Sequence, residues 1–439
     1  KAVGAFDGRI TVLHRGRVLQ TATLHGSVVT EGTPAQARAT PMLGELVPVR
    51  HGLGDLEGRR QFDLAIVTNH TPEGAPHAVA VSANQAWTAD VTESLEIVKD
   101  LNAALSGVAK SVKDYEDGLD GESGRALLVN LAKKGAWLAM NLVHNDAGQQ
   151  PEVAQSEYIQ IVSTRTDATV PFEFIYDHKV PRKDAVVCPQ WRDALAQGQC
   201  APGCAGGDAK RVCPLGFWGL RKVIERQIVR PGQEVTPRKV ILQAEPGQGR
   251  TDLPLGGTAL FASSARVPAE AQKLVTDALA ARLGNTPKTA ADWDGWMNIV
   301  EGVAPHLLLS LPHTDGSGAN VTLEIGDSTL EAIEIEREHV LPHDESSRPL
   351  VALLGCDTAG TADDYGKHVA VFRDRGAAIV IGTIATVFGE HAARVGALLA
   401  QELLPDGTPP QRLGEAMRTL RRRALLEGLL MPLCVVAYG

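Results

Sequence analysis

The sequence contains two short apolar stretches, His306-Leu-Leu-Leu-Ser-Leu-Pro-His313 and Pro349-Leu-Val-Ala-Leu-Leu-Gly-Cys356, that are informative about fold and chemistry together. Each is an uninterrupted apolar run of the kind found in strands buried on both faces of a parallel sheet. Each run ends at a side chain capable of chemistry, followed by a loop of small residues. Functional groups in open α/β sheets collect in loops at the carboxyl ends of strands. If the two strands are neighbours, the imidazole of His313 and the thiol of Cys356 face each other.

The chain beyond residue 155 alternates short apolar strands with helices of 12 to 18 residues. This alternation is typical of an α/β layer with a mainly parallel sheet flanked by helices. The predicted strands are residues 158–163, 239–244, 258–263, 306–311, 350–354, 377–382 and 433–437. The predicted helices are residues 269–283, 362–373, 387–404 and 414–426. A hairpin of residues 321–325 and 331–336 is predicted to interrupt the pattern.

The first 150 residues predict two further units. Residues 1–85 read as a small antiparallel β module that opens with a hairpin, residues 9–14 and 17–24, around an Arg-Gly turn. Apolar residues then recur every three to four positions, as at Ile97, Leu101 and Leu105, which predicts helices. We interpret residues 86–150 as a helical connector and residues 151–439 as the domain that carries the chemistry.

Bulk composition restricts the class of protein. A net charge of −9, with 44% apolar and 22% charged residues, is an ordinary globular balance and argues against direct binding of nucleic acid through a basic surface. No apolar run approaches the roughly 18–20 residues that cross a bilayer, and no signal peptide is evident, so we expect no membrane contact. The bunched cysteines do not suggest a secreted disulfide framework, which favours a cytoplasmic location. Since the sequence begins at Lys1 and not at Met, we expect it to be part of a longer gene product, and whether domains precede Lys1 is left open.

The pair of His313 and Cys356 suits nucleophilic catalysis without a cofactor. A thiol has a pKa near ~8.5, so an adjacent imidazole is needed to take its proton at neutral pH. The thiolate then attacks a carbonyl carbon, and the imidazolium protonates the leaving amine. Backbone N–H groups at Cys356 and in the turn around Thr314 to Gly316 would hold the oxyanion. Taken singly, a cysteine at a strand end is usually a packed small hydrophobe and such a histidine an ordinary surface residue.

At this point the residues resemble a known family. Residues from about 125 to 439 are similar to the CHAT domain family, caspase-like cysteine proteases related to separases. His313 and Cys356 match the catalytic histidine and cysteine of that family. The other matching blocks occur in the family's order: Val170-Pro-Phe-Glu-Phe-Ile-Tyr-Asp, Cys213-Pro-Leu-Gly-Phe-Trp-Gly-Leu, Arg375-Gly-Ala-Ala-Ile-Val-Ile-Gly-Thr, Gly414-Glu-Ala-Met-Arg and Leu433-Cys-Val-Val-Ala-Tyr-Gly.

The resemblance implies a caspase-like fold and an endopeptidase that cleaves a partner protein. Such proteases are often effectors in prokaryotic antiviral defence or regulated death, released by an upstream sensor or activator protein. This sequence departs from the family in placing Thr314 and Asp315 before Gly316, and in having Leu354 where relatives that cut after Arg or Lys often carry an acid. Two alternatives remain open: a catalytically silent interaction module of the same fold, or a thiol acyltransferase or amidase with a non-protein substrate.

Four of the six cysteines fall within 26 residues. Cys188, Cys200, Cys204 and Cys213 are separated by 11, 3 and 8 residues in a segment rich in Gly and Pro. Four thiolates in a short loop are a usual ligand set for structural zinc. The segment lacks a Cys-x-x-Cys pair, and two disulfides, a redox-sensitive cluster or unliganded thiols are the alternatives.

Overall fold

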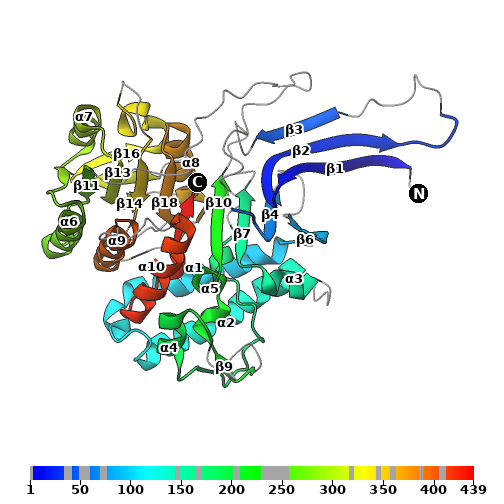
Figure 1. Ribbon diagram of the computed structural model, residues 1–439, viewed down its shortest axis with the longest axis horizontal. Coiled ribbons are helices and arrows are strands. Elements are labelled where there is room, and N and C mark those ends of the chain that lie inside the picture. Colours follow the sequence, from blue (N-terminus) through cyan, green and yellow to red (C-terminus); the bar gives the residue numbers. More distant parts are fainter. Residues whose placement is uncertain are drawn as a thin grey trace.

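The computed structural model describes residues 3–33, 42–48, 60–69, 77–143, 149–163, 170–200, 208–228, 257–315, 321–342, 348–355, 362–384, 387, 389–404 and 412–439. In these residues one large sheet has helices on both faces, and a three-stranded antiparallel sheet projects from it (Figure 1). The α/β prediction is confirmed. From one edge to the other, the large sheet consists of β12 (Lys288–Ala290), β11 (Ala259–Ser263), β13 (Leu307–Leu311), β17 (Leu350–Leu353), β18 (Ile379–Thr383), β19 (Val435–Tyr438), β10 (Val223–Ile228), β7 (Tyr158–Ser163), β4 (Leu64–Asn69), β5 (His77–Ser82) and β6 (Ala86–Asp90).

The large sheet is parallel except at two places. β18 and β19 pair antiparallel, and so do β4, β5 and β6 at one edge. Its central strands are buried on both faces, as the apolar runs predict: every residue of β13 and β17 is buried.

The helices in chain order are α1 (Thr92–Lys110), α2 (Glu122–Val143), α3 (Gln149–Gln155), α4 (Trp191–Gln197), α5 (Trp218–Arg221), α6 (Ala269–Leu283), α7 (Trp293–Val303), α8 (Ala362–Asp374), α9 (Gly389–Leu403) and α10 (Leu413–Leu426). Because β12 lies on the far side of β11, the crossover through α6 runs opposite to those through α7 and α8. Right-handed connections therefore put α6 on one face and α7 and α8 on the other. In Figure 1, α6, α9 and α10 lie side by side, with α7 and α8 across the sheet.

The projecting sheet consists of β1 (Gly4–His14), β2 (Arg17–Val28) and β3 (Met42–Pro48). Its hairpin is the one predicted from the alternation, and Arg15 and Gly16 form the turn with φ of 51° and 70°. Two consecutive positive φ angles match the twist of the flanking strands. The predicted boundary at residue 85 does not separate two sheets. Because β4 pairs in parallel with β7, the strands β4, β5 and β6 all belong to the large sheet. Pairing between distant strands is not encoded in local periodicity.

Several elements differ from their prediction. The predicted second strand at 331–336 is wrong: β16 (Ser328–Glu331) begins earlier because Gly326, at φ 55°, closes a two-residue turn after β15 (Thr322–Ile325). Residues Ala332–Glu334 then form a 3-10 turn. The strands β10 and β12 and helix α7 are not among the predicted elements. The predicted strand at 239–244 lies outside the described residues.

β10 escapes prediction because its middle is polar. It carries Arg226, which is 1% exposed yet donates to both carboxylate oxygens of Glu173 (Nε to Oε1, 2.9 Å). Arg421 of α10 lies 3.8 Å from the same carboxylate and donates to the carbonyl of Val435. This buried cluster of Glu173, Arg226 and Arg421 ties the 170–176 block to β10, α10 and β19.

No helix in the described part of the chain is long and apolar enough to span a bilayer.

Candidate active site

The site predicted from sequence lies at the carboxyl ends of β13 and β17. These strands are parallel neighbours, with Leu307 opposite Leu350 and Ser310 opposite Leu353. The N–H of Leu354 donates to the carbonyl of Ser310 (3.0 Å), so the alignment continues one residue past the last pair. A dyad of His313 and Cys356 requires that the strands before these residues be neighbours in the sheet, and they are.

His313 leaves the large sheet through Pro312 and enters a second, short strand. This strand, β14 (His313–Asp315), pairs antiparallel with β15, so His313 lies opposite Glu324 and Thr314 opposite Leu323. The sequence predicts a loop here; the structure has a strand, because β15 offers an edge to which β14 adds. Thr314 and Asp315 are consequently strand residues instead of the turn expected for the oxyanion site. The His313 side chain is 6% exposed.

Glu324 is a neighbour of His313 that sequence reasoning missed. Residues directly opposite in an antiparallel pair point to the same face with Cβ atoms about 5 Å apart. The carboxylate of Glu324 accepts from the hydroxyl of Ser264 (2.6 Å) and lies 3.3 Å from Arg266. Ser264 follows β11, which pairs with β13. The sequence does contain a signal for the orientation of Glu324. The alternation Thr322-Leu-Glu-Ile buries Leu323 and Ile325 and so turns Glu324 to the other face.

One tryptophan of α7 holds the β14–β16 sheet to the body, and a second holds the segment that follows it. The indole of Trp293 donates to the carbonyl of Leu323 (3.0 Å), and that of Trp296 to the carbonyl of His339 (2.8 Å). Trp293 and Trp296 are both buried, so both hydrogen bonds are shielded from water. Shielded hydrogen bonds of this kind fix the backbone to which His313 is paired.

Cys356 lies outside the described residues, as does Gly316. The last described residues before it, Leu354 and Gly355, are both buried. The side chain of Leu354 packs against α9 and is fully buried. This position therefore belongs to the core and does not play the part of the acid that relatives cutting after Arg or Lys often carry.

Of the cysteines predicted to bind metal, Cys188, Cys200 and Cys213 are described and Cys204 is not. Cys200 and Cys213 lie together, with their sulfur atoms 3.4 Å apart.

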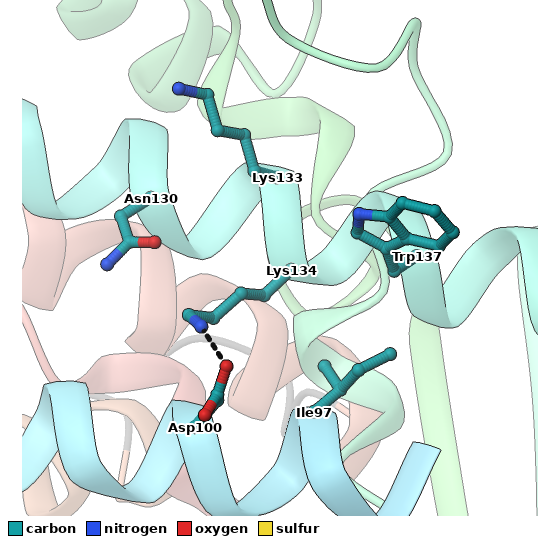
Figure 2. A pocket seen from close by; sticks show the side chains of 6 residues that line it. All are labelled: Ile97, Asp100, Asn130, Lys133, Lys134 and Trp137. Atoms are coloured by element: carbon teal, nitrogen blue, oxygen red, sulfur yellow. Dashed lines mark hydrogen bonds and ion pairs between the residues drawn. The ribbon is translucent and has the colours of Figure 1, made fainter. Parts of the chain in front are cut away.

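A hollow of about 420 Å³ lies elsewhere, between α1 and α2. Figure 2 shows the contact that crosses it, an ion pair between Lys134 and Asp100 (2.6 Å), with Trp137 and Ile97 beside it. Its lining contains no thiol, hydroxyl or imidazole, and the amine of Lys134 is paired with Asp100, so we do not assign this hollow to the reaction.

No protein-family model and no curated protein matches this sequence. Two complexes are among the solved structures that are similar in fold. The separase–securin complex of Saccharomyces cerevisiae matches with a TM-score of 0.39 and 8% identity, over 86% of this chain and 30% of that chain. The complex of Porphyromonas gingivalis RgpB pro- and mature domains matches with a TM-score of 0.36 and 10% identity, over 77% and 76%. This chain thus spans less than a third of the separase chain. Neither likeness is close enough to carry an argument about activity, and membership of the CHAT family stays a prediction.

Proposed function

We propose that this chain is a cysteine endopeptidase in which Cys356 is the nucleophile and His313 its base. The observation that carries the proposal is the register of β13 and β17. Each residue of β13 lies opposite the residue 43 positions later, from Leu307 with Leu350 to Ser310 with Leu353. The same offset of 43 positions separates His313 from Cys356 in the sequence, and each comes shortly after the carboxyl end of its strand, so we expect both to lie at the same edge of the sheet. Neighbouring strands are about 4.8 Å apart, which is within reach of a thiol and an imidazole.

The chemistry follows from that pairing. The imidazole of His313 takes the proton of the Cys356 thiol, and the thiolate attacks the carbonyl carbon of the substrate. The carbon–nitrogen bond breaks as the imidazolium returns the proton to the leaving amine. Water then hydrolyses the acyl-thioester and restores the thiol. No cofactor takes part in this sequence.

Glu324 supports the base in this scheme. It lies opposite His313 in the β14–β15 pair, and its carboxylate is fixed by the hydroxyl of Ser264, so we propose that it positions the imidazole. The resemblance to the CHAT family adds the expectation of a protein substrate and of an activating partner, with a role in prokaryotic defence or regulated death.

The first prediction concerns thiol reactivity, which can be measured without knowing the substrate. Iodoacetamide labelling of Cys356, followed by peptide mass spectrometry at neutral pH, should slow by about tenfold in His313→Ala, because the thiolate fraction falls to that of an ordinary thiol. The buried Cys434 serves as an internal reference, since burial raises the pKa of its thiol and keeps it unreactive. His306→Gln is the matched control, because His306 precedes the opposite end of the same strand.

Cleavage is tested by comparing new protein N-termini in a bacterial lysate treated with the wild type or with Cys356→Ala. We expect wild-type-specific termini, and the double variant with His313→Ala should be no weaker than either single one, because the two residues act as a unit. Equal labelling of Cys356 in wild type and His313→Ala would overturn the dyad. Normal labelling without cleavage would instead favour the silent or non-protein-substrate alternatives.

A further inference from the structure

The strand β1 forms an edge of the projecting sheet. In the described residues it pairs with β2 alone, because the strand order is β1, β2, β3 (Figure 1). An edge strand presents a row of N–H and C=O groups to which another strand can add, and proteins block such edges with proline, lysine, bulges or short strands. β1 is 11 residues long, contains neither proline nor lysine, and has its bulge only between Val12 and Leu13. Residues 4–12 are therefore suited to pairing with a further strand.

One face of β1 is apolar and open to solvent. Alternate side chains of a strand point to the same face, and on β1 this face carries Phe6, Ile10 and Val12, which are between 41% and 51% exposed. The opposite face is polar, since Arg9 donates to two threonine hydroxyls of β2 (3.0 and 3.1 Å). Four of the ten large apolar side chains that are exposed in the described part of the chain fall within residues 3–12. Exposed apolar side chains that gather in one place indicate an interaction surface.

The sequence of β1 is complementary to itself. In an antiparallel pair of two β1 strands centred on Gly8, residues equally far before and after Gly8 lie opposite each other. Phe6 of one copy then lies opposite Ile10 of the other, and Asp7 lies opposite Arg9. An aromatic residue opposite a β-branched one, and opposite charges across two strands, are pairs that stabilise a sheet. Gly8 meets itself at the two-fold axis, where a charged residue would meet its own charge.

We propose that β1 pairs with β1 of a second copy of this chain, antiparallel and in the register centred on Gly8. The pairing joins the two projecting sheets into one sheet of six strands, with Phe6 and Ile10 of both copies on its apolar face. Such an interface uses the same residues of both copies, as a two-fold symmetric dimer does. Because the paired strands run in opposite directions, their turns lie at opposite ends of the joined sheet. Each copy is anchored to its own body near that turn, where Arg17 pairs with Glu225, so the two bodies lie at opposite ends as well.

A second copy fits this edge better than a strand of another protein. β1 supplies both members of the apolar pair and both members of the charged pair, so two copies match without any further sequence. An interface of two edge strands is small beside the roughly 1,200–2,000 Å² of a stable complex, and association is weaker accordingly. We therefore expect two copies to associate at about 100 µM and to separate below about 1 µM.

The first test measures the association of the purified chain by sedimentation velocity. Between about 1 and 100 µM the wild type should change from one copy to two. Ile10→Glu should weaken the association by about tenfold or more, because it brings two carboxylates onto the apolar face beside Phe6. Ile333→Glu is the matched control, since Ile333 is 83% exposed on the 3-10 turn at Ala332–Glu334, and it should associate like the wild type. A single copy at about 100 µM, or association that Ile10→Glu leaves unchanged, would overturn the proposal.

A cysteine cross-link tests the register and keeps the experiment decisive if Ile10→Glu disturbs the hairpin. A Cβ added at Gly8 would come no nearer than 3.6 Å to its surroundings, so Gly8→Cys fits the strand. Residues directly opposite in an antiparallel pair have Cα atoms about 4.5–5.5 Å apart, which suits a disulfide. Mild oxidation with oxidised glutathione should therefore link the two thiols introduced at position 8. The control is Ala5→Cys on the same strand, which should give no link between the two copies, because Ala5 lies opposite Thr11.

Peptide mass spectrometry identifies the linked positions. A link between the two thiols at position 5, or a dimer of Gly8→Cys with no link at position 8, would overturn the register and with it the proposal. Neither the sedimentation nor the cross-link depends on protease activity, so the dimer and the proposed function can fail separately.

Discussion

At the scale of single residues, the most informative titratable group outside the proposed reaction is the half-buried His178. Its Nε2 lies 3.0 Å from Arg221, and because a guanidinium can only donate, the imidazole must accept and be neutral at that nitrogen. Burial first, and then the charges of Arg221 and Lys222, lower its pKa to about 4, although Asp177 acts in the opposite direction. Protonation would place the Nε2–H of His178 against an N–H of Arg221 in a partly buried environment.

The corresponding prediction is a loss of stability in mild acid. The folded pKa lies below the unfolded value of 6.5, so the unfolded chain binds more protons between about pH 6.5 and 4, and stability falls as the pH drops through that window. From pH 7.5 to 5 the wild type should lose about 2 kcal/mol more than His178→Gln, whose amide oxygen still accepts from Arg221 but does not titrate. Urea unfolding at both pH values measures this difference. Equal losses in the two proteins would show that His178 is not the titrating group.

At the scale of elements, the buried cluster of Glu173, Arg226 and Arg421 shows how one charged side chain can connect elements that are distant in sequence. Burial alone would raise the pKa of Glu173, but Arg226 and then Arg421 outweigh it, and the pKa ends below its ordinary value. The carboxylate is therefore ionised, and its contribution to stability would be lost only as the pH falls through that lowered value. One side chain thus joins a 3-10 turn, a strand and a helix that are far apart in sequence.

Removing that charge should be costly. Glu173→Gln leaves two guanidinium groups buried beside a neutral amide, and we expect a loss of about 3–5 kcal/mol in the free energy of unfolding. The control is Glu157→Gln, which breaks a half-exposed ion pair with Arg418 (3.0 Å) and should cost less than about 1 kcal/mol. Chemical denaturation compares the two. A similar small effect of both variants would mean that the cluster relaxes or takes up water.

The elements also show what the sequence can and cannot predict. β7 and α6 have the predicted bounds, because a mostly apolar run encodes the strand and a 3.6-residue pattern encodes the helix locally. β10 was not predicted, since Arg226 occupies a buried position that only Glu173, 53 residues earlier in the chain, makes tolerable. His313 was found from the strand before it, but Glu324 was not, because its place beside His313 depends on a register between β14 and β15 that no local pattern specifies.

At the scale of the whole molecule, the chain is a tightly packed sheet with a poorly supported arm. The arm, β1 with β2, is anchored near its turn: Val18 donates to Gln160 (2.6 Å), Arg17 pairs with Glu225, and Phe62 donates to the carbonyl of Arg15 (3.0 Å). Toward its far end the arm projects from the body (Figure 1), and Phe6 and Ile10 remain 41% and 51% exposed.

This contrast predicts a gradient of local stability that hydrogen exchange can measure. In the described residues, opening residues 4–8 of β1 breaks only their ladder with residues 24–28 of β2. Opening β7 instead separates it from both β10 and β4 and exposes Ile159 and Ile161, which are fully buried. Because the free energy of local opening grows with the apolar surface that opening exposes to water, peptides from residues 4–8 should exchange on the order of 100-fold or more faster than peptides from residues 159–162. Peptides covering residues 17–20 form the internal control, since they belong to the same arm but lie at its anchored end, and they should be intermediate.

Protection of residues 4–8 equal to that of β7, and independent of protein concentration, would contradict this view. Protection that rises with concentration would instead show that the exposed edge of β1 pairs with a second copy of the chain.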